Sequence, residues 1–147
     1  MKKHHLTLFV AVCAVIVLTG CARAAKDQTG FAIQDQTTVA APLDQTWQAA
    51  KAVLREMELD IFTRDKRGVF VAYTPMKRTF FITPHRTEFT ITMTEETSAS
   101  THIAIETVNQ VYGTTLLTYP NWHDRKAKDN SKALAILDGI KAKITTS

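Results

Sequence analysis

The chain has 147 residues, of which 45% are apolar and 22% are charged, and this is the size and composition of one globular domain. Its formal net charge of +4 includes Lys2 and Lys3, and without these two the 18 basic residues become 16 against 14 acidic ones. The remaining chain is nearly neutral, which excludes a general electrostatic affinity for nucleic acids.

The first predicted element is an export signal in residues 1–20. A cationic head precedes an apolar run from Leu6 to Leu18. This run is 13 residues long, whereas a helix needs about 20 residues to span a bilayer, so a permanent transmembrane anchor is not predicted. A buried core helix is the alternative. The lysines before the run and the polar sequence after it favour a signal peptide.

The apolar run ends in the tetrad Leu18-Thr19-Gly20-Cys21, which resembles the lipobox of bacterial lipoproteins. The resemblance implies that the Cys21 thiol receives a diacylglyceryl group, that a dedicated peptidase cleaves before it, and that the new amine is acylated. Two or more acyl chains anchor a protein stably, whereas one chain holds it marginally. An unmodified cysteine after an ordinary signal is the alternative.

The residue after the lipobox cysteine carries sorting information in this family, where an aspartate retains the protein at the inner membrane. Ala22 occupies that position. The resemblance therefore implies an outer-membrane lipoprotein that faces the periplasm, with the inner membrane as the alternative. Cys13 leaves with the signal, so the mature chain has no thiol for a disulfide, a metal or a nucleophile.

Two parts follow the signal. Residues 21–30 are predicted to hold the lipidated cysteine and a flexible polar tether, and residues 31–147 are predicted to form a single domain. Residues 31–39 predict an edge strand. The clearest helical period follows over residues 42–57, where apolar side chains recur at steps of four and three. These side chains are Leu43, Trp47, Ala50, Leu54 and Met57.

The middle of the chain changes to the two-residue period of β-strands. The predicted strands cover residues 59–63, 69–73, 79–82, 88–94 and 101–111. The first two form a hairpin, and the last two form another around a polar turn at residues 95–100. The third strand is predicted to stop at Pro84. Residues 111–119 are predicted to continue the sheet beyond Gly113.

From Pro120 onward the remaining residues predict a second amphipathic helix. Ala133, Leu137, Ile140 and Ile144 recur at steps of four and three. Gly139 weakens this helix by about 1 kcal/mol relative to alanine, but it permits close packing.

The element order β-α-β-β-β-β-(β)-α predicts an α+β fold, with an antiparallel sheet of about five strands and two amphipathic helices on one face. This order resembles the small helix-grip domains of the BamC type in envelope lipoproteins. The stretches APLDQTWQAAKAVL and DKRGVFVAY are the local likenesses. The resemblance implies an interaction module without a catalytic centre.

Basic residues around the predicted hairpins form the first candidate site. They are Arg64, Lys66, Arg67, Lys77, Arg78 and Arg86, with Phe80 and Phe81 between the last of them. If the hairpins align, these residues share one end of the sheet. They then form a cationic, aromatic-flanked rim suited to lipid headgroups, lipopolysaccharide phosphates or an acidic partner. The interpretation that we favour is a set of solvated turn charges.

The stretch YPNWHDR, residues 119–125, is the second candidate site. Tyr119, Trp122 and His123 have the composition of a protein–protein hot spot. The structural interpretation, which we favour, places Trp122 in the core and makes Asn121 the cap of the second helix.

Other chemistry finds little support in the sequence. His85, His102 and His123 lack the spacing of metal ligands. No nucleophile elbow and no phosphate-binding glycine loop occurs, so neither a catalytic residue nor a cofactor is predicted.

The sequence therefore predicts a lipid-anchored, non-enzymatic binding or assembly accessory at the periplasmic face of the outer membrane, with an envelope protein as partner. A carrier that holds a small apolar ligand or lipid between sheet and helix is the second hypothesis. An envelope-remodelling enzyme is the third.

Overall fold

A computed structural model describes residues 30–79, 83–114 and 119–146. Its elements are β1 (Ile33–Val39), α2 (Leu43–Glu56), β2 (Asp60–Asp65), β3 (Val69–Tyr73), β4 (Lys77–Thr79), β5 (Thr83–Thr97), β6 (Ser100–Gly113), β7 (Asn121–Arg125) and α3 (Ser131–Thr146). The predicted α+β class is confirmed. The signal, Cys21, the tether up to residue 29, Phe80, Phe81 and residues 115–118 of the predicted sheet continuation lie outside the described residues.

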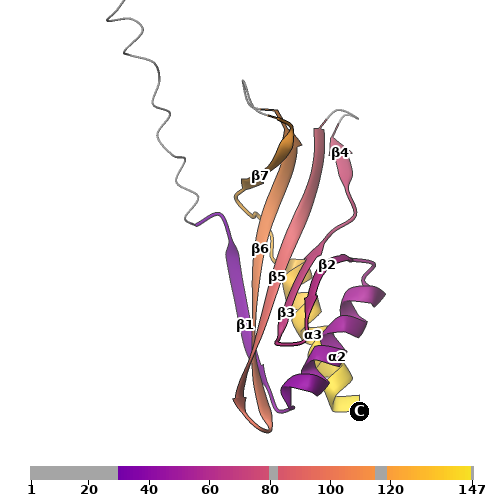
Figure 1. Ribbon diagram of the computed structural model, residues 1–147, viewed down its shortest axis with the longest axis vertical. Coiled ribbons are helices and arrows are strands. Elements are labelled where there is room, and N and C mark those ends of the chain that lie inside the picture. The colour runs from indigo at the N-terminus through magenta and orange to yellow at the C-terminus, as the bar shows by residue number, and fades with distance from the viewer. Residues whose placement is uncertain (1–29, 80–82, 115–118, 147) are drawn as a thin grey trace, which may run out of the picture.

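All the strands form one antiparallel sheet, which has seven strands rather than about five. The main order is β1-β6-β5-β3-β2, with the β5–β6 hairpin in the middle (Figure 1). Two short strands account for the excess. Strand β4 pairs with β5 beyond the end of β3, and β7 pairs with β6 beyond the end of β1.

The core lies between the two helices and one face of the sheet. The largest fully buried apolar side chains come from both layers, and they are Phe70, Phe89, Leu54, Ile91, Ile103, Ile105, Ile136 and Ile140. In Figure 1 the helices cover the lower part of the sheet, whereas β4 and β7 extend past them. We call this uncovered end, residues 77–79, 83–87, 109–113 and 121–125, the overhang.

The two helices form where the apolar periods predict them. The α2 stripe buries Trp47, Ala50 and Leu54 against the sheet. Helix α3 lies beside α2, and a Cβ atom added at Gly139 would come 3.0 Å from a methyl group of Val53. The predicted role of Gly139 in close packing is therefore confirmed.

Three predicted boundaries are wrong, and each concerns a place where the sheet extends past the helices. Strand β5 runs on to Thr97, so the turn contains only Ser98 and Ala99. Both faces of this hairpin tip are exposed, and an exposed strand needs no apolar alternation. Pro84 is the second residue of β5 rather than a stop, because proline is tolerated where a strand begins.

The third difference is the segment of residues 121–125, which forms strand β7 and not the start of a helix. The upper part of β6 supplies the partner for this strand, with Gln110 opposite Asp124 and Tyr112 opposite Trp122. Helix α3 begins only at Ser131. Asn121 is therefore not its cap, and the Asn121 side chain instead accepts a hydrogen bond from the backbone N–H of Trp122.

Candidate interaction surface

Five long side chains gather on the sheet face opposite the helices, at and beside the overhang. We call them the arginine–aromatic cluster, and they are Phe62, Tyr73, Arg86, Tyr112 and Trp122. Strand alternation explains this placement. Phe89 and Ile91 of β5 point into the core, so Arg86, at odd separation from both, points to the opposite face.

The cluster is a continuous series of ring contacts with a cation at its centre. The guanidinium carbon of Arg86 lies 3.6 Å from the ring centroid of Tyr73 and 4.0 Å from that of Trp122. Trp122 contacts Tyr112 edge to face, with centroids 5.3 Å apart, and Tyr73 contacts Phe62 at 6.1 Å. Such contacts hold a guanidinium by cation–π attraction and stacking.

A buried amide fixes the remaining orientation of Arg86. The Arg86 Nε–H donates to Gln110 Oε1 over 2.8 Å. The Gln110 amide nitrogen donates to Glu88 Oε2 at 2.8 Å and to Asp124 Oδ1 at 3.0 Å. The hydrogen bonds that link Glu88 and Asp124 to Gln110, and Gln110 to Arg86, thus orient the edge of the guanidinium. Among the described residues, no acceptor is recorded for the two terminal amino groups of Arg86, which remain able to bind an external acceptor.

A shallow cavity of about 320 Å³ adjoins the stack. Its lining residues are Asp60, Ile61, Phe62, Tyr73, Thr74, Met76, Arg86 and Trp122. Phe62 is 79% exposed and Met76 is 54% exposed. Exposed apolar side chains grouped in this way, next to polar groups, are typical of interaction sites.

The electrostatic environment keeps Tyr73 protonated. Burial raises the pKa of its hydroxyl, and the nearby negative charge of Glu88 raises it further. At neutral pH Tyr73 therefore presents a neutral ring to Arg86.

The predicted cationic rim does not form, because its residues lie at different ends of the sheet. Arg64 lies near the end of β2, and Lys66 and Arg67 lie in the β2–β3 turn that follows. This turn is beside Val69, which pairs with Thr92 of β5. Lys77 pairs with His85, seven residues away along β5. Seven residues of strand span about 23 Å. The hypothesis that the hairpin turns share one end of the sheet is therefore wrong.

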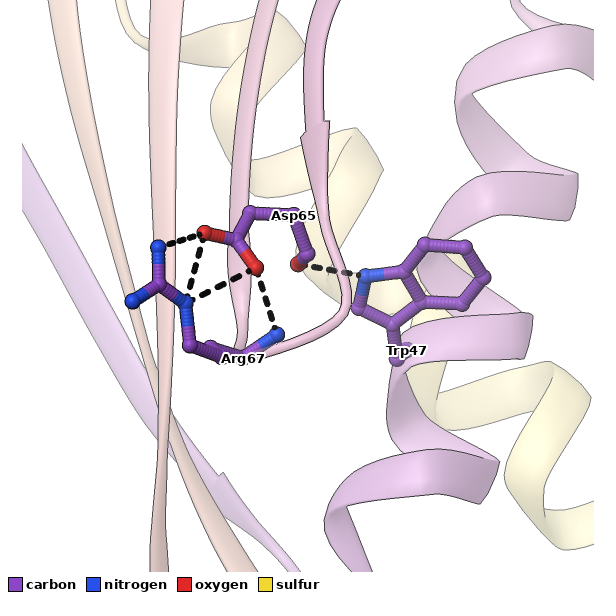
Figure 2. A network of polar contacts seen from close by, with 3 residues as sticks. All are labelled: Trp47, Asp65 and Arg67. Carbon is purple, nitrogen blue, oxygen red and sulfur yellow. Dashed lines mark hydrogen bonds and ion pairs between the residues drawn. The ribbon is translucent and has the colours of Figure 1, made fainter.

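The β2–β3 turn instead has a structural network, which Figure 2 shows. The Trp47 indole N–H of α2 donates to the backbone carbonyl of Asp65 at 2.9 Å. The Asp65 carboxylate accepts from the backbone N–H and the guanidinium of Arg67. These hydrogen bonds lower the pKa of Asp65, with the side-chain bond as the largest cause. The Arg67 side chain is 89% exposed, so this ion pair is a surface contact.

The YPNWHDR stretch differs from the favoured interpretation. Trp122 does not enter the core, because its strand lies on the overhang and its ring stacks on Arg86 at the face without helices. Tyr119 is almost fully exposed. The His123 Nε2 atom lies 3.2 Å from the carbonyl oxygen of Gly113, which ties β7 to the end of β6. Arg78 and Lys77 are exposed residues of β4.

Sequence reasoning missed five residues of this surface, which are Phe62, Tyr73, Met76, Gln110 and Tyr112. One signal for Phe62 was present in the sequence, since it lies two residues from Asp60 and two from Arg64; all three are exposed, although the strand pairing is irregular at Phe62. An aromatic side chain on a charged strand face is an exposed one. No comparable local signal marks Gln110, whose partners come from two other strands.

Comparison with known protein families and with curated proteins finds no match for this chain. Within residues 30–79, 83–114 and 119–146, no helix is long and apolar enough to cross a membrane. In the same ranges, no three His, Cys, Asp or Glu side chains come together as a metal site requires.

Proposed function

We propose that the protein is a lipoprotein, anchored through Cys21 at the periplasmic face of the outer membrane, that acts as a non-enzymatic binding accessory for an envelope protein. The single observation that supports the binding role is the stacked, partly exposed Arg86 between Tyr73 and Trp122. The lipobox-like tetrad supports the anchor.

The composition of the arginine–aromatic cluster supports a protein partner. Trp, Tyr and Arg are the residues most enriched in protein–protein hot spots, and Phe and Met are enriched at interface cores. The Arg86 guanidinium is held before any partner arrives, so binding costs little side-chain entropy there. The partner that fits is a protein segment that places an apolar side chain in the cavity and a carboxylate on Arg86.

The packing of the domain lends no support to the carrier hypothesis. Phe70, Phe89 and Leu54 are among the fully buried side chains that fill the space between helices and sheet. A cavity of about 800 Å³ is lined only by residues 45–57 and 135–146. It therefore lies between the two helices and not between helix and sheet.

Site-specific photo-crosslinking in cells tests the binding role. We expect a photoreactive amino acid at Met76, beside the cavity, to capture a discrete envelope protein. The same amino acid at Leu134, a comparably exposed apolar residue of α3, is the matched control and captures none.

The Trp122→Ala substitution in the Met76 probe strain removes one of the two rings that hold Arg86. We expect the crosslinked product to decrease at least tenfold while the protein level stays unchanged. Equal crosslinking from both probe positions, or a product insensitive to Trp122→Ala, would show that the cluster is not the binding surface.

A further inference from the structure

The helix-side face of the overhang carries a second surface, whose lining shares only Arg86 and Gln110 with the proposed binding site. We call it the basic groove, a cavity of about 670 Å³. Its lining residues are Thr83, His85, Arg86, Thr87, Asn109, Gln110, Val111, Arg125, Lys126 and Lys128. This set contains no aspartate or glutamate, so the groove has one sign of charge.

The geometry of the β7–α3 connection places its lysines at the groove. Ala127 is buried, whereas Lys126 and Lys128 on either side of it are exposed. Two hydrogen bonds hold this segment. The Ala127 backbone N–H donates to the carbonyl of Phe31 at 2.7 Å, and Asn109 Nδ2 donates to the carbonyl of Lys126 at 3.3 Å.

The groove charges are not neutralised within the described residues. Ion pairs are recorded for Arg67, Lys141 and Lys143, but none for Arg125, Lys126 or Lys128. Two carboxylates adjoin the groove cations in the sequence. That of Asp124 accepts a hydrogen bond from Gln110 Nε2, and that of Asp129 accepts hydrogen bonds from the Ser131 backbone and hydroxyl. The hydrogen bonds from Ser131 lower the pKa of Asp129, and they hold its carboxylate at the start of α3.

The groove also lies where the tether joins the domain. Phe31, whose carbonyl binds Ala127, is preceded by only nine residues after Cys21. Nine residues reach at most about 32 Å, and a flexible chain of that length averages about 17 Å. An acyl anchor on Cys21 would therefore keep Lys126 and Lys128 close to the bilayer surface.

From charge and position together, we infer that the basic groove binds the phosphate groups of anionic lipids in the membrane that holds the anchor. This inference rests on the proposed lipid anchor. Lys126 and Lys128 contact the headgroups, and Arg125 adds a third cation. Because the arginine–aromatic cluster occupies the opposite face of the same strands, headgroup binding turns the cluster away from the bilayer and toward a partner.

Fluorescence quenching of the full-length, anchored protein in vesicles tests the inference. A fluorophore on Thr83→Cys reports on the groove, and one on Ser98→Cys reports on the other end of the sheet. The quencher is attached to lipid headgroups. We expect groove quenching to be stronger in phosphatidylcholine vesicles that contain phosphatidylglycerol than in phosphatidylcholine alone, and to be lost at 1 M salt, where the Debye length is about 3 Å.

The double variant Lys126→Gln/Lys128→Gln removes the groove charges. Each lysine should contribute about fivefold to the ratio of docked to undocked orientations, because a basic residue near an anionic surface contributes about 1 kcal/mol. The matched control is Arg64→Gln/Lys66→Gln, which removes the same charge from two exposed positions, one at the end of β2 and one in the β2–β3 turn. We expect the groove fluorophore of this control to be quenched as strongly as that of the wild type.

The outcomes separate the inference from the anchor. Loss of the protein from both kinds of vesicle overturns the lipid anchor, and the inference with it. Two results would overturn groove binding and leave the lipid anchor intact. In one, the protein stays on the vesicles but groove quenching is the same in both lipids. In the other, groove quenching is equally reduced in both double variants.

Discussion

The guanidinium of Arg86 lies 4.0 Å from the ring centroid of Trp122, although the two residues belong to strands that do not pair with each other. Strand β6 lies between them and supplies Gln110, which hydrogen-bonds both Arg86 and the Asp124 side chain of β7. The contact therefore exists only when three strands are in register. It makes Trp122 a surface residue of the overhang and gives the proposed interface a rigid centre.

Arg86 and Trp122 should be energetically coupled. In a double-mutant cycle of Arg86→Gln and Trp122→Leu, we expect a coupling free energy of about 1 kcal/mol, because each single change removes the same cation–π contact. Denaturant unfolding measures the free energies. The cycle between Arg86→Gln and Leu134→Ala, which are on different elements, should be additive. Additivity in the first cycle would contradict a stabilising stack.

Gly68→Ala should destabilise the β2–β3 turn strongly. Gly68 has φ +110°, and a Cβ atom there would lie 2.2 Å from the backbone oxygen of Met93. We expect the free energy of unfolding to fall by more than about 2 kcal/mol, because the alanine is strained at this φ angle and its Cβ pushes the turn away from Met93 of β5. Gly113→Ala is the control, since no atom lies within 4 Å of its Cβ position. Equal effects at both glycines would be inconsistent with this geometry.

Two buried threonines should respond in opposite directions to removal of the hydroxyl. Thr107 is 1% exposed, and its Oγ1 has no hydrogen-bond partner within the described part of the chain. Thr107→Val should raise the free energy of unfolding by about 1 kcal/mol. Thr101 is equally buried but donates to the Ala41 carbonyl at 2.8 Å. Thr101→Val should lower the free energy by about the same amount, and chemical denaturation distinguishes the two signs.

The Asp65–Arg67 pair should stabilise the fold only above the acid range. The pKa of Asp65 is lowered from 3.8, so the folded state binds a proton less readily than the unfolded state. The pair's contribution to the free energy of unfolding is complete above the pKa of Asp65 in the unfolded state. It is lost as the pH falls through the lower pKa of Asp65 in the folded state. In an NMR titration, Arg67→Gln should raise the pKa of Asp65 toward 3.8. An unchanged pKa would remove Arg67 as the cause.

Cys21 should be the site of acylation. We expect cells that express Cys21→Ala to lose incorporation of radioactive palmitate into the protein, because the thioether cannot form. Cys13→Ala keeps the lipobox-like tetrad intact and should be labelled like the wild type. Labelling that persists without Cys21 would disprove the assignment.

The elements that the sequence predicts best are those whose period repeats over many residues. The Trp47–Leu54 stripe marks α2, and the alternation of Phe89, Ile91 and Met93 marks β5, because both follow from one-sided burial. The predicted surface failed where it depended on register. Nothing local shows that Arg67 and Lys77 are separated along β5, or that Trp122 is placed by strand pairing with β6.

The helices stop short of β4 and β7, and this has a consequence for how such a protein can change over time. No residue of the overhang belongs to the buried apolar core, so most of its side chains can be exchanged without loss of folding. Under the proposed binding role, the binding surface can therefore change by substitution while the buried apolar core beneath the helices stays constant.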